Sequence, residues 1–156
     1  MARLRLIRRL LARFGQIGPH RRALVIEAAL CLLAARLALV FIPFPRLARR
    51  LGRFVPPAEA RRLGTPSTVR HAELAADIGW AVTRAARYLP FKAVCLPQAM
   101  AARIMLKRRG VASVMHFGAA KGEAKPLDAH AWLDAAGIEV TGYPVATQFA
   151  EVACFI

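Results

Sequence analysis

Apolar and polar positions divide the chain into a helical first part and a mixed second part. Residues 1–14 alternate arginine with leucine and isoleucine, and residues 23–44 are almost continuously apolar. Pro43 and Pro45 end the long apolar run, because proline lacks the donor that a continuing helix needs. We therefore expect an arginine-rich helical arm, residues 1–65, whose helices lie near 3–13, 21–42 and 46–53.

The second part, residues 66–156, shows helical spacing first and strand patterns afterwards. Ser67 or Thr68 can cap a helix that runs to about Tyr88. After Gly110 the segments are rich in β-branched and aromatic residues, which favour strands. We expect strands in VASVMHFGA, LDAHAWLD, GIEVTGY and FAEVACFI, the middle two joined as a hairpin at AAG. Helices followed by an antiparallel sheet predict an α+β fold.

Cys95 comes directly before a well-marked helix, FKAVCLPQAMAARIMLKRRG. Pro97 suits the first turn of that helix, and Gly110 suits its left-handed stop. A thiolate at a helix start is stabilised by the positive end of the helix dipole and by unpaired N–H groups. Cys95 is therefore a candidate nucleophile, although a lone cysteine is more often a small buried hydrophobe.

His130 lies on a predicted strand 35 residues after Cys95. The two-residue period of a strand puts Asp128, Trp132 and Asp134 on the same side as His130. Burying so polar a face only for packing is costly, so we expect it to line a cleft. A base on a sheet beside a nucleophile at a helix end is the arrangement that a cysteine hydrolase requires.

The charge of the chain is large and unevenly distributed. Lys and Arg number 24 against 9 Asp and Glu, a formal net charge of +15, and residues 1–50 hold eleven arginines with Glu27 as the one acid. Such an arm is expected to meet lipid headgroups, an acidic protein or nucleic acid. Nucleic acid is the least favoured, because interleaved aromatics and zinc-finger or helix-turn-helix signatures are missing from the sequence.

Residues 23–44 are long enough to cross a membrane. These 22 residues, at about 1.5 Å each, match a bilayer core of about 30 Å. Glu27 and Arg36 interrupt the segment, and a charge near a helix centre costs about 2.5–3.5 kcal/mol. We expect a buried or interfacial helix, with a membrane span as the alternative. The basic start lacks the apolar core and cleavage site of a secretory signal.

The three cysteines, Cys31, Cys95 and Cys154, are far apart and form no Cys-x-x-Cys pair. An odd count without spacing does not predict a disulfide framework, and a reducing, cytoplasmic setting fits best. Cys95, His116 and His130 could in principle hold zinc, but no ligand spacing supports that set, so no metal is expected.

Three stretches of the second part resemble a known family. CLPQAMAARIMLKRRG, then MHFGAAK and AHAWLDAAGIEVTGYP, are similar to the leader peptidase of bacterial lasso-peptide biosynthesis, a transglutaminase-like, papain-related cysteine protease. The resemblance runs from about Gly79 to Tyr143. Residues 21–52 also resemble the helical front end of the stand-alone form of this family, in which the leader-binding domain is a separate protein.

The resemblance implies that Cys95 is the nucleophile and His130 the base. The acid that commonly follows the histidine by about a dozen residues falls here on Thr141 or Gly142. In a two-residue hairpin Thr141 would face His130, with Glu139 diagonal to it, so Glu139 is the preferred third member. Asp128, Asp134 and a backbone or amide group remain as alternatives.

Other polar and aromatic residues near the predicted site have two readings each. The N–H groups of the first turn are candidates to bind the oxyanion, and Gln98 is a side-chain candidate that could equally face solvent. Trp132 could wall the cleft but is more simply a core residue. His116 and Trp80 are expected to be structural.

The resemblance further implies a substrate and partners. The enzyme would remove the leader peptide from a precursor so that an asparagine-synthetase-like cyclase can close a ring, aided by the separate leader-binding protein. ATP dependence is suggested by the resemblance alone, because the sequence has no phosphate-binding loop. Acyl or amide transfer through the same thioester, and a non-catalytic membrane-associated scaffold, are the alternatives. The arm is expected to dock to partner proteins, at the cytoplasmic face of the membrane.

Overall fold

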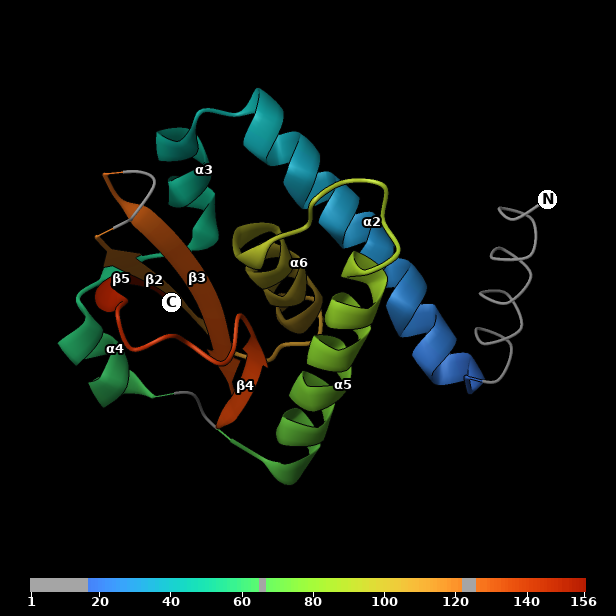
Figure 1. The fold of residues 1–156 in the computed structure, drawn as a ribbon. Helices are drawn as coiled ribbons and strands as arrows, with labels where there is room; N and C mark the ends of the chain where they lie inside the picture. Colours follow the sequence, from blue (N-terminus) through green and yellow to red (C-terminus); the bar gives the residue numbers. More distant parts are fainter. Residues whose placement is uncertain (1–16, 65–66, 122–125) are drawn as a thin grey trace.

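The computed structural model describes residues 17–64, 67–121 and 126–156, which form helices packed on an antiparallel sheet (Figure 1). The predicted α+β class is confirmed. The helix expected near residues 3–13 lies outside the described residues. The division between an arm and a protease region at residue 65 stays a prediction.

Prolines and polar caps set the helix starts. Pro19, Pro45 and Pro57 each lie in the first turn of a helix, where their missing N–H needs no partner. The predicted cap at Thr68 is confirmed, because its hydroxyl accepts a hydrogen bond from the His71 N–H. The described helices are α2 (Pro19–Phe41), α3 (Phe44–Leu51), α4 (Pro57–Leu63), α5 (Val69–Ala86) and α6 (Cys95–Lys107).

The sheet has five strands in the order β1-β5-β2-β3-β4, and every neighbouring pair is antiparallel. The four expected strands are confirmed. The hairpin expected between the middle two has its turn at Ala136 and Gly137, both with positive φ. The strands are β1 (Phe54–Val55), β2 (Val114–Ala120), β3 (Asp128–Ala135), β4 (Ile138–Thr141) and β5 (Ala150–Phe155).

Two short elements, β1 and α4, were not expected from the sequence. Two residues of β1 carry too little pattern to be read as a strand, yet Phe54 and Val55 pair with Phe155 and Cys154. The prolines before α4 suggest a break in the chain. In the structure they cap and start that helix instead.

The two faces of the sheet pack differently. Met115, Leu133 and Phe155 point into the main core, which they share with buried residues of α2, α5 and α6. Their strand neighbours point to the other face, where Val55, Val114 and Cys154 form a smaller cluster with Ala60 of α4. A residue's place along a strand therefore decides whether it faces α6 or the α4 side.

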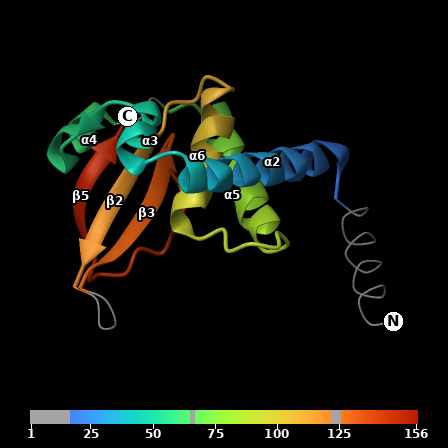
Figure 2. The ribbon, with the colours of Figure 1, turned by 90° about the horizontal axis from the view of Figure 1, so that it is seen from above.

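Helix α2 lies across α5 and α6, on the side of these helices away from the sheet (Figure 2). Leu24, Ala28 and Leu32 are buried against them, and the Glu27 carboxylate binds the Arg109 guanidinium at 2.5 Å and Arg108 at 3.3 Å. These contacts confirm that one face of α2 is buried. By length and composition α2 is also the one described helix that could cross a membrane, and 33% of its most apolar window is buried in the protein.

Candidate active site

Cys95 is the first residue of α6 and is half-buried. Val94 before it is extended, and the first intrahelical bond runs from the Gln98 N–H to the Val94 carbonyl. The N–H groups of Cys95 and Leu96 therefore have no partner within the helix, and Pro97 has no N–H to offer. The predicted helix start is confirmed, and it presents a thiol beside two free donors.

Gln98 has a structural partner. Its side-chain Nε2 donates a hydrogen bond of 2.6 Å to the Ala93 carbonyl, five residues earlier. This bond fixes the segment that leads into Cys95. The amide is thereby directed to the backbone before the helix, which argues for a positioning role over that of an oxyanion donor.

His130 is half-buried on β3, and one of its ring nitrogens is held by the backbone. Its Nε2 lies 2.7 Å from the Gly142 carbonyl oxygen. A carbonyl can only accept, so Nε2 carries the proton, and in the neutral ring Nδ1 is left with a free lone pair. The Gly142 carbonyl thus leaves Nδ1 of the neutral His130 ring able to accept a proton.

Aromatic rings surround His130 on two sides. The centroid of the Phe149 ring lies 5.2 Å from that of His130, and the Trp132 ring stacks on it at 5.9 Å. The stacking confirms that His130 and Trp132 share one face of β3. Trp132 itself is buried, as a core tryptophan would be.

Cys95 and His130 approach the sheet from different sides. Helix α6 packs on the face that carries Leu133, whereas strand alternation turns His130 to the face of Trp132. Among the described residues no hydrogen bond joins the thiol to the imidazole. Hydrogen bonds between catalytic groups are often long or unmade until a substrate binds, so the pairing stays a prediction.

The geometric reason for choosing Glu139 is wrong. The turn pairs Glu139 with Asp134, and a register shift beyond it pairs Thr141 with Leu133, so neither faces His130. Glu139 is exposed on β4 instead. The two-residue hairpin closes at Ala135 and Ile138, so Glu139 pairs with Asp134 from the turn itself, and the extra residue Val140 on β4 affects only Thr141.

The other carboxylates near His130 in sequence do not replace Glu139. Asp128 is exposed, and Asp134 accepts a hydrogen bond from the Tyr143 hydroxyl and lies beside His116. The backbone alternative fits best, because the Gly142 carbonyl is the group that holds His130. Gly142 has φ +86°, and an added Cβ would collide with the Ala131 carbonyl and the Trp132 backbone, so only glycine allows this close approach.

A second polar group, missed in the sequence, lies on the other side of Trp132. The His116 ring stacks on Trp132 at 5.4 Å, with Nδ1 2.5 Å from Glu151 Oε1 and Nε2 3.2 Å from Asp134 Oδ2. The Cys154 thiol donates to Glu151 Oε1 at 3.0 Å and lies 3.4 Å from His116 Nδ1. His116 and Cys154 are directly paired across β2 and β5, 38 residues apart in sequence.

Burial and mutual contact change the pKa values of His116 and Cys154. Burial alone lowers the pKa of His116, but its contacts with Asp134 and Glu151 outweigh this and raise the pKa above its usual value. Burial, reinforced by the Glu151 carboxylate, raises the pKa of the Cys154 thiol to about 12. Cys154 is therefore a poor nucleophile in this network, unlike a cysteine at a helix start.

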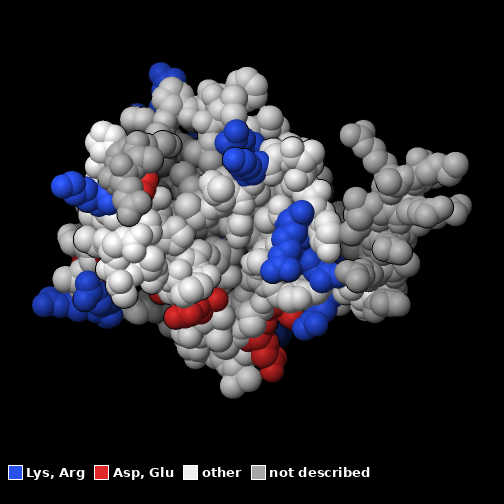
Figure 3. Space-filling model, viewed as in Figure 1, with Lys and Arg blue, Asp and Glu red and all other residues white. Residues whose placement is uncertain are grey.

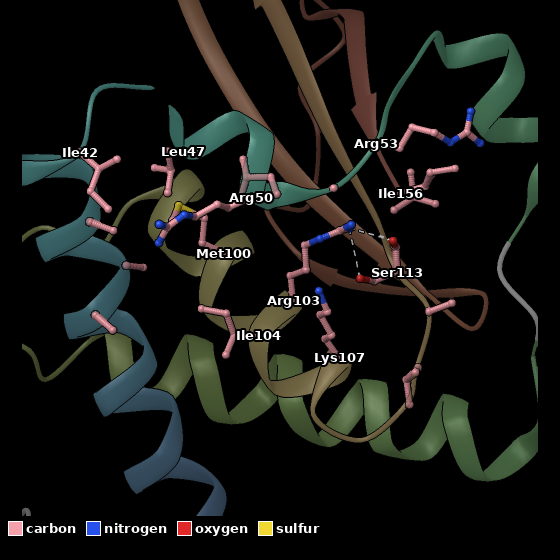
Figure 4. A pocket seen from close by; sticks show the side chains of 18 of the residues that line it. Ile42, Leu47, Arg50, Arg53, Met100, Arg103, Ile104, Lys107, Ser113 and Ile156 are labelled. Atoms are coloured by element: carbon pink, nitrogen blue, oxygen red, sulfur yellow. Dashed lines mark hydrogen bonds between the residues drawn. The ribbon is translucent and has the colours of Figure 1, made fainter. Parts of the chain in front are cut away.

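A cavity of about 670 Å³ lies between α2, α3 and α6 (Figure 4). Its wall is mostly apolar, with Ile42, Leu47 and Met100 among the lining residues. Its polar side chains include four bases and no acid: Arg50, Arg53, Arg103 and Lys107. Neither Cys95 nor His130 lines it, so this basic groove is separate from the candidate catalytic residues.

Arg103 is the most buried base of the basic groove. Its Nη1 donates to the carbonyls of Ser113 and Phe155, at 2.9 Å and 3.0 Å, and burial lowers the pKa of its guanidinium. Within the described part of the chain, Arg103 makes no hydrogen bond to a carboxylate. The surface charge has a related asymmetry, since acidic side chains gather at one edge of the face in Figure 3 and basic ones are spread over the rest.

Comparison with known proteins identifies the family and no individual relative. None of the curated proteins and none of the solved structures matches the chain. A family model described as the transglutaminase-like superfamily matches residues 38–154, which is more than half of the chain. The match includes Cys95, His130 and all five strands apart from the last residue of β5. The chain belongs to the transglutaminase-like superfamily, whose members fit a cysteine protease or acyltransferase.

Proposed function

We propose that this chain is a cysteine protease that removes the leader peptide from a ribosomally made lasso-peptide precursor. One observation carries the enzymatic part: in a transglutaminase-like chain, Cys95 opens α6 while His130 is oriented by Gly142 to keep Nδ1 free. The precursor as substrate rests on the motifs CLPQAMAARIMLKRRG and AHAWLDAAGIEVTGYP. These motifs resemble the leader peptidases of that pathway.

The proposed reaction requires Cys95 and His130 to come within hydrogen-bond reach of one another when the precursor binds. The Cys95 thiol gives its proton to His130 Nδ1, and the sulfur attacks the carbonyl carbon at the leader junction. The N–H groups of Cys95 and Leu96 stabilise the oxyanion of the tetrahedral intermediate. His130 then protonates the departing amine, which leaves a thioester, and water cleaves the thioester to regenerate the thiol.

Acyl transfer is the second candidate, because it shares the thioester and differs only in the acceptor. An amine in place of water would give an amide product. Superfamily membership fits both outcomes. Precursor incubated with the full chain and a small primary amine would separate them by mass: protease activity predicts free leader acid, and transferase activity predicts a leader amide.

Two partners belong to the proposal, a separate leader-binding protein and an asparagine-synthetase-like cyclase. The resemblance to the stand-alone form of the leader peptidases implies that the leader-binding domain is a separate protein. A partner that holds the leader would raise the effective concentration of the precursor at Cys95. We expect the leader-binding protein to lower the apparent KM for cleavage, measured by mass spectrometry of the precursor. Equal rates with and without that protein would contradict the division of labour.

The exposed face of α2 supports docking to such a partner. Its apolar side chains recur every three or four residues, the spacing of a coiled-coil seam, and are Ile26, Leu30, Leu33, Leu37 and Val40. Arg36 beside this seam is exposed and would face a like charge in a second copy of the chain. We therefore assign the seam to an apolar helix with acidic flanks on a partner protein, with the enzyme in the cytoplasm at the membrane face.

Substitutions on the seam test this docking. Leu33→Ser with Leu37→Ser should weaken binding to the leader-binding protein or the cyclase at least tenfold, measured by isothermal titration calorimetry. Val69→Ser is the control, because Val69 is more exposed than Leu33 and Leu37 but lies at the start of α5. Unchanged affinity in the double variant would contradict the seam. A membrane fraction that resists carbonate would show that α2 enters lipid instead.

A further inference from the structure

Cys154, His116 and Glu151 bring three metal-ligand atoms together beneath α4. The Cys154 Sγ, a His116 ring nitrogen and a Glu151 carboxylate oxygen lie within 4.8 Å of one another. Cys154 is fully buried, His116 is 8% exposed and Glu151 lies at the rim. Thiolate, imidazole and carboxylate are the ligand types that zinc and similar divalent transition metals take in proteins.

A β-bulge in β5 places these three side chains on one face of the sheet. His116 pairs with Cys154 and Phe117 with Ala153, but Gly118 pairs with Glu151, which leaves Val152 as an extra, exposed residue. In a regular strand residues 151 and 154 would point to opposite faces. The extra residue reverses the alternation, so the Glu151 carboxylate joins the Cys154 thiol.

The surroundings of His116 also match those of a metal-bound histidine. Asp134 Oδ2 lies 3.2 Å from Nε2, the ring nitrogen that does not face Cys154, and the Tyr143 hydroxyl donates to Asp134. A carboxylate beside the second ring nitrogen is the usual outer partner of a ligating histidine. Here Nε2 is buried without an aligned hydrogen bond, and a small turn of Asp134 would complete that bond and direct the lone pair of Nδ1 to the metal. Trp132 stacked on the ring restricts its rotation.

The distances require only a small opening of the cluster. Tetrahedral zinc with bonds of about 2.0–2.3 Å separates its ligands by about 3.3–3.6 Å. The distance from Cys154 Sγ to His116 Nδ1 is already 3.4 Å, whereas Glu151 Oε1 lies closer to both, at 3.0 Å and 2.5 Å. Glu151 can withdraw toward the solvent, where its other carboxylate oxygen faces Arg61 at 3.4 Å.

We propose that His116 Nδ1, Cys154 Sγ and Glu151 form a site for Zn²⁺, with Asp134 as the outer partner of His116 and water in the fourth position. Binding displaces the thiol proton of Cys154 and any proton on His116 Nδ1 to solvent. The ion would join β2 to β5 at the point where the bulge interrupts their ladder. This site is independent of the proposed protease activity, because it contains neither Cys95 nor His130.

Metal analysis of the full chain tests the site without any substrate. After incubation with Zn²⁺ and gel filtration, elemental analysis should find about one zinc per wild-type chain. Cys31→Ser should retain it, since Cys31 is a buried cysteine on α2 outside the cluster, and Cys154→Ser should lose it. With Co²⁺ as the probe, wild type should show a thiolate-to-cobalt charge-transfer band in the near ultraviolet that Cys154→Ser lacks.

Two further variants keep the proposal testable if Cys154→Ser does not fold. Glu151→Gln should weaken the zinc affinity and reduce the zinc-induced rise in melting temperature, and Asp134→Asn should weaken the affinity by about 10–100-fold through its effect on His116. Wild-type protein that binds no zinc above the background would overturn the site. Equal zinc binding by wild type, Cys154→Ser and Glu151→Gln would also overturn it, because the metal would then lie elsewhere.

Discussion

Two histidines flank Trp132 on the same face of the sheet, and their surroundings differ. His130 is half-buried, has one backbone partner and keeps a free ring nitrogen. His116 is buried, and both of its ring nitrogens face carboxylates. A free nitrogen near solvent suits proton transfer, whereas a buried ring with a carboxylate beside each nitrogen suits a fixed charge or a metal ligand. Both histidines stack on Trp132, so the difference that we expect between their roles comes from the other groups that each ring contacts.

The largest expected effect is on catalysis by His130. His130→Ala removes the base, so leader cleavage should fall by about 10²–10⁴-fold, while the melting temperature changes little because the side chain is half-exposed. Initial rates by mass spectrometry of the precursor give the first value, and thermal unfolding gives the second. Wild-type rates in a folded variant would remove the functional difference between the two histidines.

His116 should show the opposite balance, with its main effect on stability. His116→Ala leaves Asp134 and Glu151 without the imidazole between them, which should lower the free energy of unfolding by about 1–3 kcal/mol, because Asp134 is partly exposed and both carboxylates keep other donors. Urea unfolding in the presence of a chelator measures this. The account would be contradicted by a free energy of unfolding equal to that of wild type.

Gly142 and Glu139 compete as the group that orients His130. Gly142→Ala introduces a Cβ where Ala131 and Trp132 leave no room, so the carbonyl must move and cleavage should fall by about tenfold. Glu139→Gln should keep the rate within about twofold, because Glu139 is exposed and pairs with Asp134, four residues along β3 from His130. A larger loss in Glu139→Gln than in Gly142→Ala would restore the carboxylate as the third member.

The smallest effect is expected where α2 meets α6. The hydrogen bond from Arg109 lowers the pKa of Glu27, so this group contributes stability above its unfolded pKa and loses it as the pH falls through the folded one. Glu27→Gln should lower the free energy of unfolding at neutral pH and flatten its decline in acid. Unfolding curves at a series of pH values below 5 would show it, and parallel curves for both proteins would contradict it.

The sequence predicted the elements better than their fine geometry. Pro97 and Gly110 mark both ends of α6, so the place of Cys95 at a helix start could be read directly. Alternation along β3 correctly put His130 and Trp132 on one face. These predictions succeed because capping residues and strand period are local properties.

Register shifts explain most of what could not be predicted. The extra residue Val140 on β4 shifts Thr141 to Leu133, and the extra residue Val152 on β5 brings Glu151 to the side of Cys154 and His116. A bulge depends on pairing with a strand far away in sequence, so the pattern of one segment does not reveal it. For the group that holds His130, the sequence contained one indication: Gly142 lies where the leader-peptidase resemblance implies an acid.

Leader removal by cysteine variants tests the central claim, that Cys95 is the nucleophile of this enzyme. Precursor and leader-binding protein would be incubated with wild type, Cys95→Ala or Cys31→Ser, and the leader and core peptides would be followed by mass spectrometry. We expect wild type and Cys31→Ser to release the leader and Cys95→Ala to release none while keeping its circular dichroism spectrum. Release of the leader by Cys95→Ala at the wild-type rate would contradict the account.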